Sequence, residues 1–373
     1  MIMVVYSPSM VRQGFVEDII SCSWIRRFRT AGECNLQVPF RPQNEALLRV
    51  GNILMQLGGR EAMQIVYRKL EKNATNMDTI SIRAASLFAW TGQRVNIAGL
   101  DSDKYTPQGI IQKLFRENVT SASVAARRIP NVVLRSRSAY SQTAVDYSAE
   151  PYSELQGLIE EQLEDSDMGC LIDTDPETGI HTFDFVEATD KTETAPIPCI
   201  FSVEFGSLGA QNFVYSIENY KSTAYVQGGD EGIVEVLGNA YTGLERFEVG
   251  VSASDIQLES TNPDNPEETI TLTEAQVRSK LQKRGKDELK NSYQLEQTFE
   301  GTANQITALR YKVDYDIGDR VTCICTNWNV KVDATITQIT ETYSPGGLTI
   351  AVVFGDGTPT LKGAIMAAIK TRS

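Results

Sequence analysis

Alternating hydrophobic and polar positions dominate the first hundred residues. Residues 24–40 read W-I-R-R-F-R-T-A-G-E-C-N-L-Q-V-P-F, which places two alternating strands on either side of a turn at Gly32. Further alternating runs, separated by Gly, Asn and Asp, occupy 53–57, 63–70 and 79–84. Many short antiparallel strands joined by such turns favour a barrel or a sandwich.

Helical spacing replaces this alternation after residue 104. Thr106 and Pro107 form a helix start, with the threonine as N-cap and the proline in the first turn. A second helix is predicted to start at residues 150–153. Two strands then flank a Pro-Gly hairpin turn at 175–179. Helices beside a hairpin predict a small α+β domain.

Alternation returns at residue 199, and a helix interrupts it. Residues 260–271 are predicted to be a mobile polar loop, and Thr273 to cap a helix. The sequence therefore predicts a mainly β protein with an α+β insert and two β-barrel-like domains. The predicted domains are 1–104 (first β-barrel-like domain), 105–198 (α+β insert), 199–358 (second β-barrel-like domain, with the inserted loop and helix at 260–291) and 359–373 (C-terminal tail, with a helical run at 361–369).

The formal charge of −13 over 373 residues bounds the function. An acidic surface repels phosphate backbones and anionic membranes, so we expect no sequence-specific binding of nucleic acid. The ordinary interpretation is a soluble surface that keeps copies apart. No apolar stretch approaches the ~20 residues of a membrane-spanning helix. The N-terminus lacks a basic region followed by an apolar run, so we predict no secretory signal and assembly in a cytoplasm.

Cysteine and histidine give no metal site. The six cysteines are scattered, and only Cys323 and Cys325 are close, on one face of a predicted strand. This spacing is typical of core packing by reduced thiols. His181 is the only histidine. We therefore expect no metal and no cofactor.

Two groups of acidic residues are candidate sites. Asp314, Asp316 and Asp319 offer oxygen ligands for a hard cation, but a turn bent at Gly318 explains them better. Asp173, Asp175, Glu177 and Asp184 contain acids of the type that hydrolyse glycans, although polar residues are ordinary beside a hairpin turn. No G-x-S-x-G elbow or phosphate-binding P-loop is present, so we predict no catalytic site.

One cluster of aromatic and basic residues is our candidate interface. It comprises Trp24, Arg26, Arg27, Phe28 and Arg29. Aromatic residues and arginine are enriched at protein interfaces, and arginine makes bidentate contacts with carboxylates. For the aromatic residues Trp24, Phe28 and Trp90, packing in the core is favoured over a role at an interface. A solvated strand face remains an equal alternative for the arginines.

Motifs at both ends carry a family resemblance. After the W-I-R-R-F-R-T-A-G run come a helix–hairpin segment at 152–186, an A-Y-V-Q-G strand at 224–228, D-I-G-D-R-V-T at 316–322 and I-T-Q-I-T-E at 336–341. In this order they resemble the siphovirus tail proteins typified by the ReqiPepy phage gene-37 product. Those proteins are similar in plan to the baseplate hubs of phage tails and related injection machines.

The resemblance implies a structural protein of the virion, at the tail tip. Such a hub is a homotrimer whose two barrels per subunit present six in all. It would adapt a sixfold tail tube to a threefold tip and help to close or open the DNA channel. The implied partners are the distal tail, tail tube and tape measure proteins, with a tail fibre or tip protein. DNA would only pass through.

Two other functions stay open. One is a receptor- or glycan-binding protein at the tail tip, which exposed aromatic residues in a groove would support. The other is a cell-wall hydrolase associated with the tail, because hubs of this type often continue into such a domain. Because the sequence continues for only about eighteen residues after Phe354 and Gly355, we expect no hydrolase domain of that kind.

Overall fold

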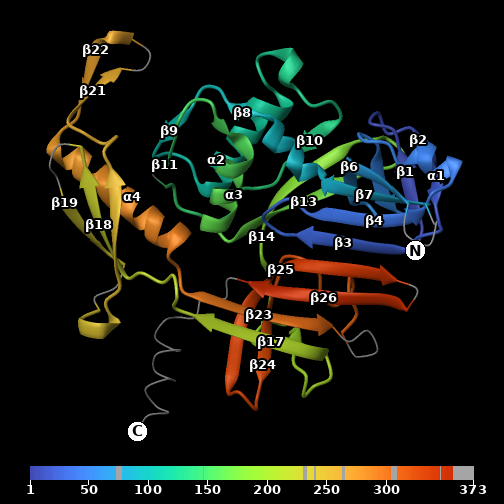
Figure 1. Cartoon of the computed structure of the whole chain (residues 1–373). Coiled ribbons are helices and arrows are strands. Elements are labelled where there is room, and N and C mark those ends of the chain that lie inside the picture. Colours follow the sequence, from blue (N-terminus) through green and yellow to red (C-terminus); the bar gives the residue numbers. More distant parts are fainter. Residues whose placement is uncertain are drawn as a thin grey trace. The chain divides into compact units, whose positions relative to one another are not determined.

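The protein is mainly β, with most of its helices in the insert and in α4, which confirms the predicted fold class (Figure 1). The computed structural model describes residues 1–355 except 73–77, 146, 230–232, 239–240, 263–264, 304–308 and 345. The predicted C-terminal tail lies outside the described residues. The chain forms two compact units: unit 1 contains residues 1–212 and those from 299 on, and unit 2 is Phe213–Thr298. The sequence-based domain boundaries stay a prediction.

Residues 1–86 of unit 1 form seven strands that bury a shared core. The alternation predicted for residues 24–40 is observed, because Trp24, Cys34, Leu36 and Val38 all point inward. A Cβ at Gly32 would lie 2.5 Å from the carbonyl oxygen of Ile25, so the turn needs glycine. The elements are β1 (Met3–Tyr6), β2 (Arg12–Val16), β3 (Ser21–Arg27), β4 (Glu33–Pro39), α1 (Pro42–Leu47), β5 (Ile53–Gln56), β6 (Ala62–Lys72) and β7 (Asp78–Ser86).

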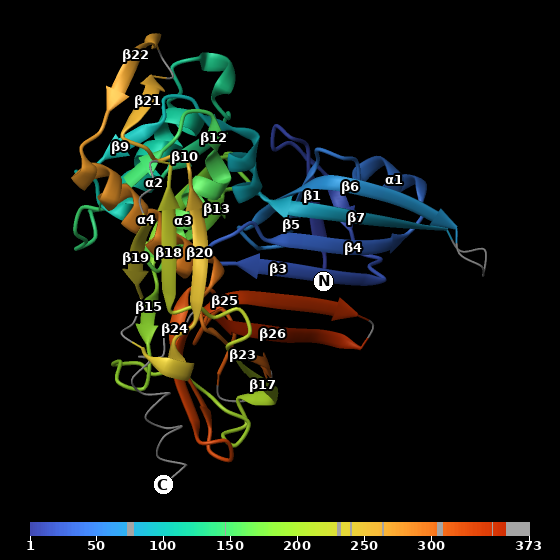
Figure 2. The ribbon, with the colours of Figure 1, turned by 60° about the vertical axis from the view of Figure 1, so that its left-hand side comes forward.

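The second β region of unit 1 is hydrogen-bonded to the first. Its long strand β25 pairs antiparallel with β3, placing Glu341 opposite Trp24 (Figures 1 and 2). Both regions therefore share one 14-stranded sheet, in which the described strands run in an open path from β17 to β2. The elements are β15 (Thr189–Lys191), β16 (Ile200–Phe201), β17 (Leu208–Ser216), β23 (Glu296–Ala303), β24 (Asp319–Cys325), β25 (Val330–Ser344) and β26 (Gly347–Gly355).

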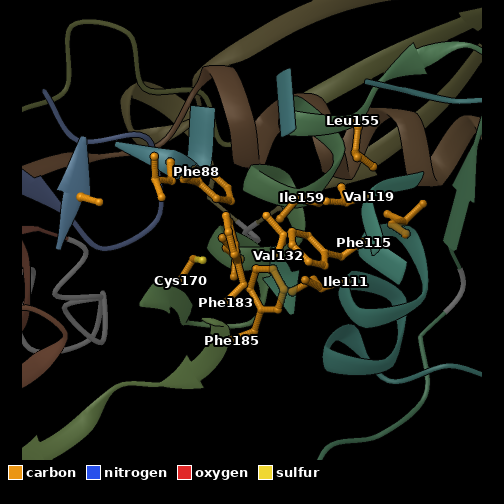
Figure 3. Packing of buried hydrophobic residues seen from close by; sticks show 14 of the residues in the cluster. Phe88, Ile111, Phe115, Val119, Val132, Leu155, Ile159, Cys170, Phe183 and Phe185 are labelled. Atoms are coloured by element: carbon orange, nitrogen blue, oxygen red, sulfur yellow. The ribbon is translucent and has the colours of Figure 1, made fainter. Parts of the chain in front are cut away.

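The α+β insert of unit 1 packs helices against a hairpin. The Thr106 hydroxyl accepts a bond from the Gly109 amide at 3.1 Å, as expected of an N-cap. The Phe115 ring packs at a tilt against Phe183 and edge-on against Phe185 in the core (Figure 3). The elements are η1 (Leu87–Gln93), β8 (Val95–Asn96), β9 (Leu100–Ser102), α2 (Pro107–Phe115), η2 (Arg116–Thr120), η3 (Ala125–Arg127), β10 (Val132–Leu134), β11 (Tyr147–Ala149), β12 (Ser153–Glu154), α3 (Leu155–Asp165), β13 (Met168–Thr174) and β14 (His181–Glu187).

The start of the second insert helix needs a correction. We expected it at 150–153, but α3 begins at Leu155 with Glu154 as its cap. Tyr152 has a φ of 64°, which is incompatible with a helix, and Ser153 pairs in β12. The Glu-Pro-Tyr-Ser sequence therefore forms a turn before the helix.

Unit 2 packs one helix on a small sheet. Leu281 of α4 contacts the core of β19–β18–β20, and Gly285 lets the helix approach Val226 closely. The predicted polar loop is instead a hairpin, because threonine is β-branched and favours strands. The elements are β18 (Thr223–Gly228), β19 (Ile233–Leu237), η4 (Gly243–Glu245), β20 (Glu248–Ala253), β21 (Glu259–Asn262), β22 (Asn265–Thr271) and α4 (Glu274–Ser292).

Candidate functional site

The candidate interface residues lie where β3 meets β25 and the insert. In the single chain, Trp24 and Phe28 are each 1% exposed and Arg26 and Arg29 each 8%. Within a single chain, Trp24 and Phe28 therefore pack in the core, which is the alternative that the sequence favoured. Arg27 is half-buried and bonds to Gln338. Their contact with another protein stays a prediction.

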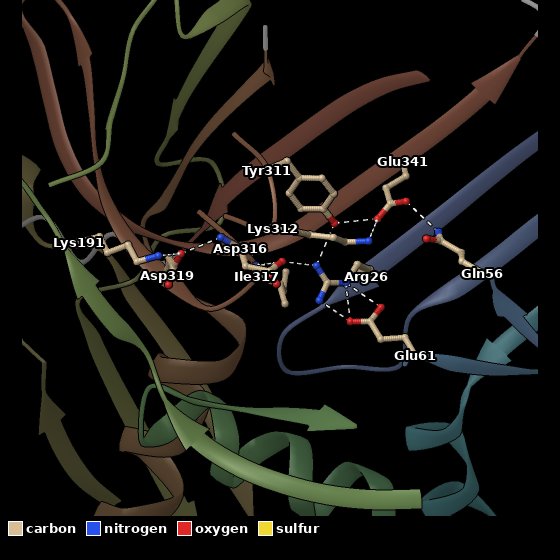
Figure 4. A network of polar contacts seen from close by, with 10 residues as sticks. All are labelled: Arg26, Gln56, Glu61, Lys191, Tyr311, Lys312, Asp316, Ile317, Asp319 and Glu341. Atoms are coloured by element: carbon tan, nitrogen blue, oxygen red, sulfur yellow. Dashed lines mark hydrogen bonds and ion pairs between the residues drawn. The ribbon is translucent and has the colours of Figure 1, made fainter. Parts of the chain in front are cut away.

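The guanidinium of Arg26 joins groups from three separate segments (Figure 4). Its Nε bonds both carboxylate oxygens of Glu61, at 2.6 and 2.8 Å, and its Nη1 donates to the Tyr311 hydroxyl at 2.9 Å. It also forms an ion pair with Asp316. Burial opposes the charge, but Glu61, Tyr311 and Asp316 outweigh it and raise the pKa of Arg26. The cation is thereby fixed within the chain.

Glu341 is the second centre of this network. It is 1% exposed and accepts from the Tyr311 hydroxyl at 2.9 Å, from Gln56 at 2.8 Å and from Tyr343 at 2.8 Å, while Lys312 lies 2.8 Å away. Burial alone would raise the pKa of its carboxyl, but Lys312 and the other donors outweigh burial and lower the pKa. β25 is thereby tied to β5 and to the 311–312 segment.

The acidic run at 314–319 is a turn, as predicted. Asp314 pairs with Arg310 at 3.0 Å, and Asp319 pairs with Lys191 at 2.8 Å. Gly318 has a φ of 84°, and a Cβ there would lie 2.4 Å from the Phe28 ring. Among the described residues, no group of three or more His, Cys, Asp or Glu is placed to hold a metal ion.

The second acidic group is also committed to structural contacts. Asp173 pairs with Arg60, and Asp184 receives two bonds of 2.6 Å from Arg137. Asp175 accepts the Glu177 amide at 2.9 Å inside the hairpin turn. Asp173 pairs near the surface, whereas the buried carboxylate of Asp184 is paired with an arginine. The prediction of no enzymatic activity stays a prediction.

His181 lies in the core between β13 and η1. Its Nδ1 is 3.1 Å from the Thr174 hydroxyl, and its ring packs edge-on against Trp90 at 5.2 Å. Burial lowers the pKa of the imidazole to about 4. A structural histidine, the interpretation preferred from sequence, fits this position.

A cavity of about 50 Å³ lies beside the network. Arg26, Arg27, Glu61 and Cys170 are among the residues that line it. Such a volume holds a few water molecules at most, because one water needs roughly 10–15 Å³ of this measure. All six cysteines are free and buried, and Cys323 and Cys325 both lie in the core, as predicted.

Sequence reasoning found Arg26 but missed most of its partners. Glu61, Tyr311, Lys312 and Glu341 come from segments distant in sequence. The sequence did contain one signal for Glu341. It lies two residues after Ile339 in an alternating strand, so both side chains are expected on the inward face of the sheet. A buried carboxylate requires a partner, but the sequence does not say which.

The family model for Siphovirus ReqiPepy6 Gp37-like protein matches residues 2–356. The chain belongs to this family. No curated protein matches the sequence. Within the described residues, the structure of this family member has no helix long and apolar enough to cross a membrane.

Solved structures share the fold of this Gp37-like family member. The tail protein from Neisseria meningitidis MC58 is 14% identical, with a TM-score of 0.57, and the match covers 95% of this chain and 96% of that one. The 43 kDa tail protein of prophage MuSo2 from Shewanella oneidensis is 12% identical, with a TM-score of 0.56 and the same coverages. Prophage tail protein gp18 from Listeria monocytogenes is 12% identical, with a TM-score of 0.51 and coverages of 99% and 98%. The chain therefore has a phage tail-protein fold of the baseplate-hub type.

Proposed function

We propose that this protein is a structural component of a phage or prophage tail that forms a homotrimeric baseplate hub at the tail tip. The observation that carries the proposal is the end-to-end similarity of fold. At least 95% of this chain and 96% of each of three tail proteins superpose. Nearly the whole chain also matches one siphovirus family.

The arrangement of the sheet supports a role as a symmetry adapter. Each chain contributes two β regions, joined through β3 and β25. Three chains would present six such regions, so a threefold object would sit on a sixfold tail tube. The buried network of Arg26 and Glu341 supports this role by holding the two regions in one fixed arrangement within each subunit.

The proposed partners are other tail components. They are the distal tail, tail tube and tape measure proteins, with a tail fibre or tip protein. The formal charge of −13 fits a channel that passes DNA without binding it, since negative walls repel phosphates. The same charge opposes self-association, so we expect the isolated chain to trimerise weakly and in a concentration-dependent manner.

Two measurements test the proposal. Mass photometry at low and high salt reports how many copies associate, and electron microscopy of assembled tails shows where they lie. We expect three copies at the tip, with more trimer at higher salt if long-range repulsion dominates. A stable dimer, or six copies per tail tip, would rule the hub out.

A further inference from the structure

The C-terminal half of β6 lies at an open edge of the large sheet. β5 pairs with residues 62–64 of β6 only, whereas β7 pairs with β6 from Met63 to Lys72. The loop before β5 reaches one residue further, through bonds of Gly51 and Asn52 with the backbone of Ile65. Beyond that point β6 continues along β7 (Figure 2), and no other described strand pairs with it.

This edge carries unpaired backbone groups. In an antiparallel strand, alternate residues direct their amide and carbonyl away from the partner strand, so residues 67–72 offer about three donors and three acceptors to the outside. Among the described residues, no hydrogen bond reaches these groups from beyond the β6–β7 pair. A row of this kind is a template for one more strand. We call residues 67–72 the open edge of β6.

The apolar core beneath β7 extends as far as the open edge. Ile80 and Ile82 of β7 are buried, whereas Leu70, which pairs with Ile80, is 54% exposed. Tyr67, on the opposite face of the strand, is 45% exposed. A further strand beside β6 would cover both side chains, so burial of apolar surface would add to the backbone bonds.

Cationic residues flank Leu70 and restrict which strand can pair there. Arg68 and Lys72 lie two residues to either side of it, on the same face. Glu45 neutralises Arg68 at 2.9 Å. Lys72 is exposed and makes no ion pair among the described residues, although Asp78 lies opposite it on β7. An incoming strand with an apolar residue beside Leu70 and a carboxylate beside Lys72 would therefore fit this face.

A second copy of β6 fits the open edge poorly. Two such strands would place cations against cations, which destabilises a strand pair. They would also pair about a twofold axis, which a ring of three copies does not contain. The strands at the two ends of the large sheet, β2 and β17, contain no carboxylate. These strands of a second copy therefore lack the charge that the open edge calls for.

We infer that the open edge of β6 binds an extended segment of another tail protein as an added strand. The segment carries an apolar side chain beside Leu70 and a carboxylate beside Lys72. This inference rests on the proposed function as a tail component and names the chemistry of one partner. Backbone bonds would supply affinity, and the two side-chain positions would supply specificity.

Hydrogen exchange, read amide by amide, tests for the added strand. Residues 67–72 are compared in the isolated chain and in purified tails that contain it. We expect the outward amides to exchange rapidly in the isolated chain and at least about tenfold more slowly in tails, because strand pairing protects them. The inward amides bond to β7 and should be protected in both samples, which makes them an internal control.

A pair of substitutions tests the chemistry of the partner. Leu70→Ser/Lys72→Glu removes the apolar contact and reverses the charge. The matched control, Leu244→Ser/Lys104→Glu, makes the same changes at exposed positions of unit 2 and the insert. In tails, we expect the edge variant to lose about tenfold of the protection and the control to keep it. Leu70→Val/Lys72→Arg preserves both features and should stay protected. Thermal unfolding of each variant checks its fold.

Four outcomes would overturn the inference. If tails contain the chain but its outward amides exchange as fast as in isolation, no strand is added and the proposed tail role stands. If protection appears in the isolated chain as its concentration rises, the occupant is a second copy. If the edge variant stays as protected as its control, the partner's chemistry is wrong. If purified tails lack the chain, the proposed function fails and the inference with it.

Discussion

Arg26 holds three acidic or phenolic groups from a position that is 8% exposed. Replacing it with methionine keeps the apolar part of the side chain but leaves Glu61, Asp316 and Tyr311 without their shared donor. We expect Arg26→Met to lower the free energy of unfolding by about 2–3 kcal/mol. This is below the usual 3–5 kcal/mol for breaking a buried pair, because Glu61 and Asp316 stay partly solvated. Urea denaturation measures the loss.

The neighbouring Arg27 provides a matched control for Arg26. Its side chain is 30% exposed and bonds to Gln338 and to the Ala31 carbonyl. Arg27→Met should cost about 1 kcal/mol or less, as is usual for partly solvated pairs. Equal losses for the two variants would show that the buried network contributes no more than an ordinary surface contact.

The only histidine of the chain gives a prediction for pH dependence. Burial lowers the pKa of His181 to about 4 in the folded chain, below the ordinary value of 6.5. Between these values the unfolded chain binds a proton that the folded chain does not, so stability is complete above about pH 6.5 and falls towards pH 4. A shift of this size corresponds to roughly 3 kcal/mol.

The solitary His181 signal in a proton NMR titration reports this pKa directly. Urea denaturation from pH 7 to pH 4.5 measures the stability change, and His181→Asn should remove its histidine-dependent part. An imidazole that titrates near 6.5 in the folded protein would contradict the prediction.

At the scale of elements, two helix glycines should respond oppositely to alanine. A Cβ at Gly285 of α4 would lie 2.6 Å from Val226 on β18, so Gly285→Ala should destabilise unit 2 by about 1–2 kcal/mol through overpacking. A Cβ at Gly157 of α3 meets only the flexible end of Glu154, at 3.2 Å. Gly157→Ala should therefore raise stability by up to about 1 kcal/mol through helix propensity. Thermal unfolding of both variants measures the difference, and the same sign for both would contradict it.

Elements with strong local signals were predictable from the sequence. The Thr106 and Thr273 caps confirm two helix starts, and the inward residues of β4 follow the expected alternation. The prediction was wrong in two segments whose local sequence signals are weak. The expected loop contains a strand pair rich in threonine, and Tyr152 has a left-handed backbone conformation before α3. Composition describes polarity, but it does not describe pairing partners.

At the scale of the whole molecule, the sequence could not show that β3 pairs with β25. More than three hundred residues separate Trp24 from its partner Glu341, and alternation is silent about register between distant strands. The same limit applies to the arginines. Their number and spacing made Arg26, Arg27 and Arg29 candidates for an interface. Whether these side chains are exposed depends, however, on which carboxylates from distant parts of the sequence lie beside them.

The last prediction concerns the enzymatic activity of the whole chain. The described acids at 173–184 are engaged in ion pairs and a turn, and His181 is buried beside Thr174. One cavity bounded by described residues, that of about 50 Å³ beside Arg26, is far below the ~300 Å³ at which ligand pockets begin. We therefore expect the isolated chain to release no soluble fragments from purified peptidoglycan under conditions where lysozyme does. Clear turnover that Glu177→Gln or Asp175→Asn abolishes, with the fold intact, would place a hydrolytic site on the hairpin and replace the purely structural role.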